Sequence, residues 1–146
     1  MLGLIARRLH LAPFVLVSAP AAGPPPDDPR DLVQKDVIGW EFMGPHDHWH
    51  LVHADGGSVD VEVTPRLVSD NLLVLREAAL EGLGIAPMST LLCAGDIAAG
   101  RLQVVAPGWS PPPATLYAIY ASRGSLSTAG RVFIDDFASY LSAAYR

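Results

Sequence analysis

The stretch VTPRLVSDNLLVLREAALEGLGIAPM, residues 63–88, constrains the fold more than any other part of this chain. It joins the end of a strand, a turn, a helix, two glycines and a second strand. Before it, Val59, Val61 and Val63 alternate with polar residues, which is typical of a strand with one buried face. We expect Pro65 to end this strand, because proline cannot donate a ladder hydrogen bond. Strands that alternate with helices indicate an α/β domain with a mixed or largely parallel sheet.

The turn at residues 68–71 should begin the helix. Serine, aspartate and asparagine suit a helix N-terminus, because their side-chain oxygens accept unpaired backbone N–H groups. Apolar residues then recur at helical spacing, at Leu72, Leu75, Ala79 and Leu83. Gly82 suits the left-handed position after a helix, and the apolar run at residues 85–87 resembles a buried parallel strand. The glycines follow a helix, which disfavours a dinucleotide-binding loop.

The rest of the chain contains further strands and helices. We expect strands at residues 37–42, 46–52, 58–63, 102–105 and 116–120, and helices at 29–34, 89–99 and after Ser127. The turn at residues 54–57, ADGG, should close a hairpin. The proline-rich segment 20–30 is either a surface loop or a hinge. One face of the last helix should carry Phe133, Phe137, Tyr140 and Leu141.

Composition narrows the class of protein. The chain has 146 residues, 50% hydrophobic and 17% charged, which predicts one domain with a packed core. Its net charge of −5 with only 10 Lys plus Arg argues against a nucleic-acid surface. Cys93 is the only cysteine, so we expect no internal disulfide and a cytoplasmic location. No apolar run reaches the roughly 20 residues that a membrane span needs.

The N-terminus allows two interpretations. Arg7 and Arg8, an apolar stretch and Ala19-Pro20-Ala21 resemble a secretion signal, yet His10 and Pro13 interrupt the apolar run. Alternatively, LIARRL and FVLVSAP are two strands. Nearly the whole chain, including these segments, resembles the effector-binding region of LysR-type transcriptional regulators. The matching segments are VTPRLVSDNLLVLREAALEGLGIAPM, DLVQKDVIGW, Trp49 ahead of the DG turn, AAGRLQVV, the tryptophan of PGWSPPP, LYAIYASRGSLS and RVFIDDFASYL.

This resemblance implies a periplasmic-binding-protein-like (type 2) α/β fold with two lobes. Residues 1–22 and 115–146 would form an incomplete first lobe, and residues 23–114 the second. No DNA-binding domain is expected in this chain, so DNA would be contacted only through a domain outside it. The sequence departs from the family at Ala21-Ala22, where Tyr-Leu is usual, and at Ser89, where a proline is common.

The resemblance also implies a sensor of a small metabolite, active as a homo-oligomer when full length, with no catalytic residue, metal, cofactor or membrane contact. Effector contacts are expected at Val68, Ser69, Asp70 and Asn71, and family members often use the residue aligned with Ser69. A helix N-terminus also attracts carboxylate or amide groups. Ser69 would otherwise only cap the helix, and Asp70 would repel an anion.

Three further groups have competing interpretations. His46, His48 and His50 would share one strand face and bind zinc, or they belong to a polar edge, with His46 or His48 at the mouth of a cleft. Trp40, Phe42 and Trp109 line either a pocket or the core. Cys93 is expected to be a buried small hydrophobe, and Asp135 and Asp136 face different directions. The alternatives to a regulator are a secreted solute-binding protein and a small metal-dependent hydrolase.

Overall fold

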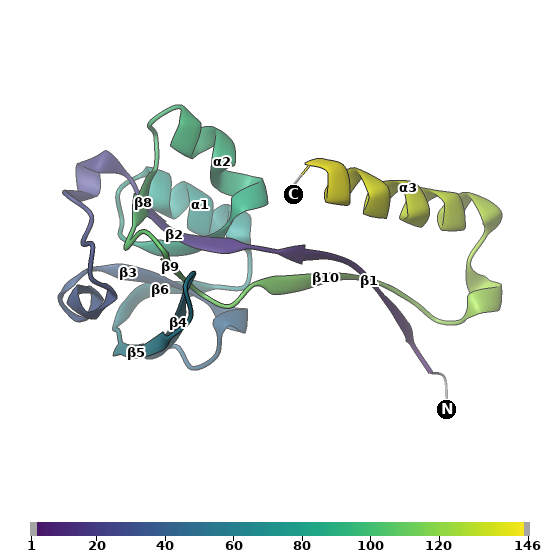
Figure 1. Cartoon of the computed structure of the whole chain (residues 1–146), viewed down its shortest axis with the longest axis horizontal. Coiled ribbons are helices and arrows are strands. Elements are labelled where there is room, and N and C mark those ends of the chain that lie inside the picture. The colour runs from purple at the N-terminus through teal and green to yellow at the C-terminus, as the bar shows by residue number, and fades with distance from the viewer. Residues whose placement is uncertain (1–2, 145–146) are drawn as a thin grey trace. The chain divides into compact units, whose positions relative to one another are not determined.

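The computed structural model describes residues 3–144, without the side chain of Arg123, and divides the chain into two compact units. Unit 1 contains the described residues up to Ala12 and from Pro113 onward, and unit 2 spans Pro13–Pro112 (Figure 1). The chain enters unit 2 at Pro13, before the lobe boundary expected after residue 22, so β2 (Phe14–Ser18) lies in unit 2 and not with the segment expected in the first lobe. The proline-rich segment 20–30 lies wholly within unit 2. The chain therefore passes from unit 1 to unit 2 ahead of this segment, between Ala12 and Pro13.

Strand β2 (Phe14–Ser18) is the centre of the main sheet of unit 2. It lies between β7 (Ala86–Ser89) and β8 (Gln103–Val105) and runs antiparallel to both. The expectation of a parallel strand here is wrong for β7, since only a single parallel bridge joins Ile85 to Val37. All four β7 residues are buried, so the continuous apolar run reflects burial on both faces rather than strand direction.

Two further sheets complete unit 2, one of two strands and one of three. Strand β3 (Val37–Trp40) pairs in parallel with β6 (Pro65–Ser69), and β4 (His48–His53) pairs with β5 (Ser58–Glu62) and β9 (Trp109–Ser110). The hairpin expected around residues 54–57 is confirmed, with Gly56 and Gly57 at φ angles of 96° and 90°. Strand β6 was not expected. Pro65 begins it, a position where a missing N–H costs no ladder bond.

The helices of unit 2 have local signals at both ends. Helix α1 spans Leu72–Leu80, and Gly82 follows it with a φ of 81°. Leu83 N–H donates to Ala78 O, which is the hydrogen bond expected where a helix stops at a glycine. Helix α2 (Thr90–Ala98) begins after Ser89, whose side chain accepts from Leu91 N–H. The expected helix at residues 29–34 is a 3-10 helix, Pro29–Gln34, with Asp28 as its N-cap. Shorter 3-10 turns lie at Pro20–Ala22 and Glu41–Met43.

Among the described residues, unit 2 has two clusters of buried apolar side chains and one buried charge. One cluster of buried side chains surrounds Leu16, Trp49 and Leu51, and a second lies beneath α1 and α2. In the second region Asp96 is only 2% exposed. Arg76 donates to its two oxygens at 2.7 and 3.0 Å, and Arg101 donates at 3.0 Å. These bonds tie α1 to α2 and to the turn after α2.

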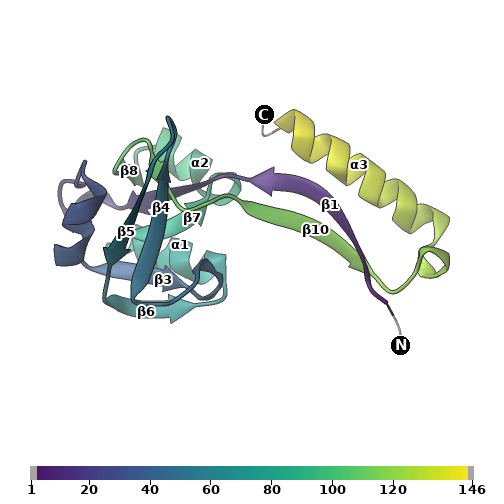
Figure 2. The ribbon, with the colours of Figure 1, turned by 60° about the horizontal axis from the view of Figure 1, so that its bottom comes forward.

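Unit 1 is a two-stranded ribbon with one helix. Strand β1 (Ile5–Ala12) pairs antiparallel with β10 (Ala114–Tyr120), with a bulge between Arg8 and His10. A 3-10 turn, Arg123–Ser125, leads to α3 (Thr128–Ala144), which lies along the ribbon (Figure 2). Ser127 caps α3 as expected, accepting from Gly130 N–H at 3.0 Å.

The expected apolar face of α3 is only partly buried. Leu141 is buried, but Phe133 and Tyr140 are 66% and 60% exposed, and Phe133 stacks on Phe137 with ring centroids 5.8 Å apart. A two-stranded ribbon covers only the side of a helix that faces it, so the rest of the apolar surface stays exposed. No helix among the described residues is long and apolar enough to cross a membrane.

Candidate functional site

The parallel pairing of β3 with β6 builds the candidate site in unit 2. Its register sets Trp40 opposite Ser69 at the ends of the two strands. The chain then turns through Asp70, whose side chain is exposed, and enters α1 at Leu72. The expected contact residues Val68, Ser69, Asp70 and Asn71 therefore lie beside Trp40, for which both a pocket and a core position were considered.

Hydrogen bonds within the turn assign a different cap from the one expected. Asn71 is the N-cap of α1, since its Oδ1 accepts from Leu73 N–H at 3.0 Å. Ser69 Oγ accepts instead from Asn71 N–H at 3.1 Å, so Ser69 braces the turn and does not cap the helix. Asn71 O accepts from Val74 and Leu75. Leu72 N–H lies in the first helical turn, where backbone N–H groups lack intrahelical acceptors, and the Ser69 hydroxyl can also donate its proton.

Aromatic rings extend the site away from the turn. Trp40 Nε1 donates to Asp70 O at 3.4 Å, which joins the indole to the turn. Phe14 stacks on Trp40 at 5.0 Å, and Phe42 meets it edge-on at 5.7 Å. Phe42 is 69% exposed, so this row of rings runs from the core to solvent. Of the three aromatics weighed as pocket or core, Trp40 and Trp109 are half-buried and Phe42 is exposed.

The three histidines considered as a zinc group, His46, His48 and His50, have different partners. His46 precedes β4 and pairs with Glu41 at 3.1 Å, while His48 and His50 flank Asp60 at 3.4 and 2.8 Å. The hydrogen bond from His50 is the main cause that lowers the pKa of Asp60. Among residues 3–144 no three His, Cys, Asp or Glu side chains form a group able to hold a metal ion. Glu41, the partner of His46, directly follows Trp40 in the chain.

The cysteine offers no nucleophile. Cys93 is fully buried in α2, and burial raises its pKa to about 11. The thiolate needed for attack is therefore scarce near neutral pH. This agrees with the expected small buried hydrophobe.

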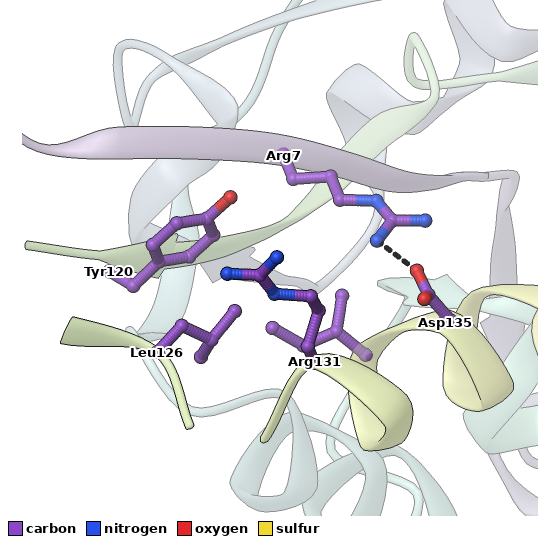
Figure 3. Close-up of a pocket in the computed structure, with 6 residues that line it drawn as sticks. Arg7, Tyr120, Leu126, Arg131 and Asp135 are labelled. Atoms are coloured by element: carbon purple, nitrogen blue, oxygen red, sulfur yellow. Dashed lines mark hydrogen bonds and ion pairs between the residues drawn. The ribbon is translucent and has the colours of Figure 1, made fainter. Parts of the chain in front are cut away.

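Two hollows were not expected from the sequence. One, of about 330 Å³, lies in unit 2 between the proline-rich segment and the Gly82–Ile85 loop, and Ser18 and Lys35 border it. The other, of about 380 Å³, lies in unit 1 between the ribbon and α3 (Figure 3). Their walls come from residues far apart in the sequence, so no local pattern signals them. Arg7 and Asp135 had been noted separately, without a sign that they meet.

Comparisons with known proteins agree over nearly the whole chain. The sequence pattern of the LysR substrate binding domain matches residues 2–142. The HTH-type transcriptional regulator PtxR of Pseudomonas aeruginosa is 30% identical over 142 residues, 95% of this chain and 45% of PtxR. The chain thus spans somewhat less than half the length of such curated relatives.

Solved structures place the fold in the same group. The regulatory domain of CrgA from Neisseria meningitidis has a TM-score of 0.78 and 26% identity, covering 95% of this chain and 69% of that structure. The regulatory domain of AphB from Vibrio vulnificus has a TM-score of 0.71 and 31% identity, covering 94% and 69%. The fold is the periplasmic-binding-protein-like (type 2) α/β fold of these regulatory domains. The chain therefore belongs to the LysR substrate-binding domain family.

Proposed function

We propose that this chain is the effector-sensing region of a LysR-type transcriptional regulator. The observation that carries the proposal is the family match over residues 2–142. It favours a regulator over a secreted solute-binding protein or a metal-dependent hydrolase, since the relatives are named as transcriptional regulators and not as enzymes. In this proposal unit 2 is the second lobe, unit 1 is part of the first, and DNA contact, oligomerisation and a cytoplasmic location belong to the whole protein.

The effector would bind at the turn from Val68 to Asn71. The Ser69 hydroxyl and Leu72 N–H are two donors at one helix N-terminus, where the helix dipole also favours an acceptor group. Trp40 and the exposed Phe42 supply an apolar wall beside them. An amide or a single carboxylate fits these donors. Asp70 disfavours a ligand that carries several negative charges.

Effector binding would act by selecting one conformation of the regulator. A ligand that binds one arrangement better shifts the population toward it, and only by its difference in affinity. His46 and His48 remain candidates for the rim of the site, with His46 held near Trp40 through its pairing with Glu41.

A ligand screen followed by one substitution tests the site. Small carboxylates and amides are screened by thermal shift against the chain, and each compound that binds is titrated by calorimetry. Ser69→Ala should weaken binding about tenfold, the loss expected for one hydrogen bond to a ligand. Ser58→Ala, at an exposed serine in β5, is the matched control. Equal affinity in all three proteins for every compound found would reject Ser69 as a contact.

DNA binding by this chain alone should be absent. Its net charge is −5, and phosphate contacts need clustered Lys and Arg. An anisotropy titration against duplex DNA at moderate salt measures this. Saturable, sequence-dependent binding at sub-micromolar protein would contradict the proposal that DNA is contacted through another domain.

A further inference from the structure

The hollow of unit 2 has the size of a small-molecule site. It measures about 330 Å³, within the range of roughly 300–1,000 Å³ found for small-molecule pockets. Its walls come from the end of β2, the proline-rich segment, the chain between the 3-10 helix Pro29–Gln34 and β3, and the loop after α1. None of these segments belongs to the turn proposed to bind the effector.

Hydrogen bonds and rigid rings hold the walls of this hollow in place. Gln103 Nε2 donates to Gly23 O at 2.8 Å and to Ser18 Oγ at 3.3 Å, which ties the proline-rich segment to the main sheet. Ile85 N–H donates to Asp36 O at 2.9 Å and fixes the loop after α1. Three consecutive prolines, with fixed φ angles, form a further part of the wall. A preformed site of this kind loses little conformational freedom when a ligand binds.

The lining carries one charge of each sign. Lys35 and Asp36 are its charged residues, so the lining is neutral as a whole. No carboxylate of the described residues pairs with Lys35, and Asp36 pairs with the exposed Arg66 at 3.4 Å. Exposed ion pairs are weak, so the ammonium group of a ligand can compete for Asp36.

The neutral part of the lining combines one buried hydroxyl with apolar surface. Ser18 is only 2% exposed, and its hydroxyl accepts from Gln103 and can also donate its proton to a ligand. The prolines, Leu83 and Ile85 supply aliphatic surface. The hollow therefore offers partners for a carboxylate, an ammonium group and an aliphatic chain within one small volume.

We propose that this hollow binds a small aliphatic α-amino acid in its zwitterionic form. The ligand carboxylate pairs with Lys35 and accepts from the Ser18 hydroxyl, and the ligand ammonium group pairs with Asp36. The aliphatic side chain packs on the prolines and Leu83. A zwitterion uses both charges of the lining at once, whereas an ion of one sign uses only one of them.

This hollow and the proposed effector site lie at opposite ends of two strands. Ser18 ends β2, whereas Phe14, which stacks on Trp40, begins it. Asp36 directly precedes β3, and Trp40 ends it. The four steps from Phe14 to Ser18 cover about 13 Å, at roughly 3.3 Å per residue. The two ligands therefore occupy separate places, and either site can fail experimentally without the other.

Titration of the chain with L-leucine, followed by amide chemical shifts, tests the proposal. 4-Methylpentanoate is leucine without its ammonium group, and L-leucinamide is leucine without its carboxylate. Each should bind at least about fivefold more weakly than leucine, because each lacks one of the two charge pairs. Leucine should shift amides at residues 18–26, 34–36 and 82–85, and not those of the turn at residues 68–71.

Two substitutions assign the charge pairs. Lys35→Gln should weaken leucine binding at least about fivefold but should not weaken binding of L-leucinamide, which has no carboxylate. Asp36→Asn should weaken binding of leucine but not of 4-methylpentanoate, and it keeps the backbone carbonyl that holds Ile85. Lys35→Arg keeps the charge and should retain most of the affinity. A merely structural role for either side chain predicts equal losses for all three compounds.

Arg30→Gln is the matched control, because it removes an exposed cation from the adjoining 3-10 helix, outside the lining of the hollow. It should leave leucine affinity within about twofold of the wild-type value, the effect of an exposed charge that makes no ligand contact. Circular dichroism checks that each variant is folded.

Three results would overturn the proposal. They are no leucine binding at millimolar concentration, equal affinity for leucine and 4-methylpentanoate, and chemical-shift changes confined to the turn at residues 68–71. The last result would locate leucine at the proposed effector site, so it would support that site while rejecting this one.

Discussion

The two units of this chain differ in how their apolar residues are used. Among the described residues every buried hydrophobic side chain lies in unit 2, apart from Ala12 and Leu141. Unit 1 instead exposes most of its large apolar side chains: Leu4, Leu11, Leu116, Tyr117, Ile119, Val132, Phe133 and Tyr140. Both units follow amphipathic patterns, so pattern alone does not make a core. A pattern is buried only where a second layer covers it.

The number of layers explains the contrast. In unit 2, α1 packs on β7 and β3, and the β3–β6 and β5–β4–β9 sheets supply buried side chains to the rest of the interior. In unit 1 a two-stranded ribbon carries one helix, and two strands rarely suffice for independent stability. The ribbon face that carries Arg8, Tyr117 and Ile119 points away from α3. Exposed apolar patches of this kind promote association.

Hydrogen exchange should show the largest difference between the units. Amides of β2 and β7 should exchange only on global unfolding, whereas those of β1 and β10 should exchange through local opening. Since domain stabilities are about 5–15 kcal/mol, the rates should differ by several orders of magnitude. Exchange monitored by NMR on a monomeric sample measures this. Strong and uniform protection in both units would show that unit 1 is as self-sufficient as unit 2.

A matched pair of leucine substitutions should give the next largest effect. Leu16 is fully buried in β2, while Leu116 of β10 is 38% exposed. Leu16→Ala should lower the free energy of unfolding by about 2–5 kcal/mol, because it leaves a cavity in a packed interior. Leu116→Ala should cost less than about 1 kcal/mol. Urea denaturation of the two variants gives both values. A larger loss in Leu116→Ala would mean that unit 1 has the more important core.

The buried carboxylate of unit 2 gives an intermediate effect. Asp96→Asn should cost about 2–3 kcal/mol, since it weakens charge-assisted hydrogen bonds from Arg76 and Arg101. The hydrogen bond from Arg76 lowers the pKa of Asp96 in the folded state. Asp96 therefore stabilises the fold above its unfolded pKa of about 3.9, and this contribution is lost as the pH falls below that value.

Urea denaturation of wild type and Asp96→Asn across this pH range is the measurement. The difference in stability should be full at neutral pH and shrink in acid. Asp136→Asn, which removes one exposed carboxylate from α3 of unit 1, is the control and should change stability little. A difference that stays constant down to low pH would contradict the assigned role of the Asp96 charge.

The turn before α1 should show the smallest change in stability. Asn71→Ala removes the helix cap and should cost about 1 kcal/mol. Ser69→Ala removes only the brace to Asn71 N–H, so its cost should be about half as large or less. Thermal unfolding compares the two. If Ser69→Ala is the more destabilising, Ser69 is mainly structural and the case for it as an effector contact weakens.

Features that depend on neighbouring residues could be predicted without the structure. The alternating valines of residues 59–63 gave β5, the glycines of residues 54–57 gave the hairpin turn, and Gly82 gave the end of α1. The family resemblance also followed from local motifs. Such features could be predicted because their hydrogen bonds and side-chain periods are set within a few residues.

Which segments pair with one another could not be predicted from local patterns. Strand β7 pairs antiparallel with β2, β6 pairs with β3 to set Trp40 beside Ser69, and Arg7 reaches Asp135 across 128 positions. The N-cap of α1 is Asn71 and not Ser69, because strand β6 extends to Ser69. Strand partners depend on the packing of whole layers, and a short apolar run fits several partners equally well. Burial followed the same rule, since similar patterns form a core in unit 2 and an open surface in unit 1.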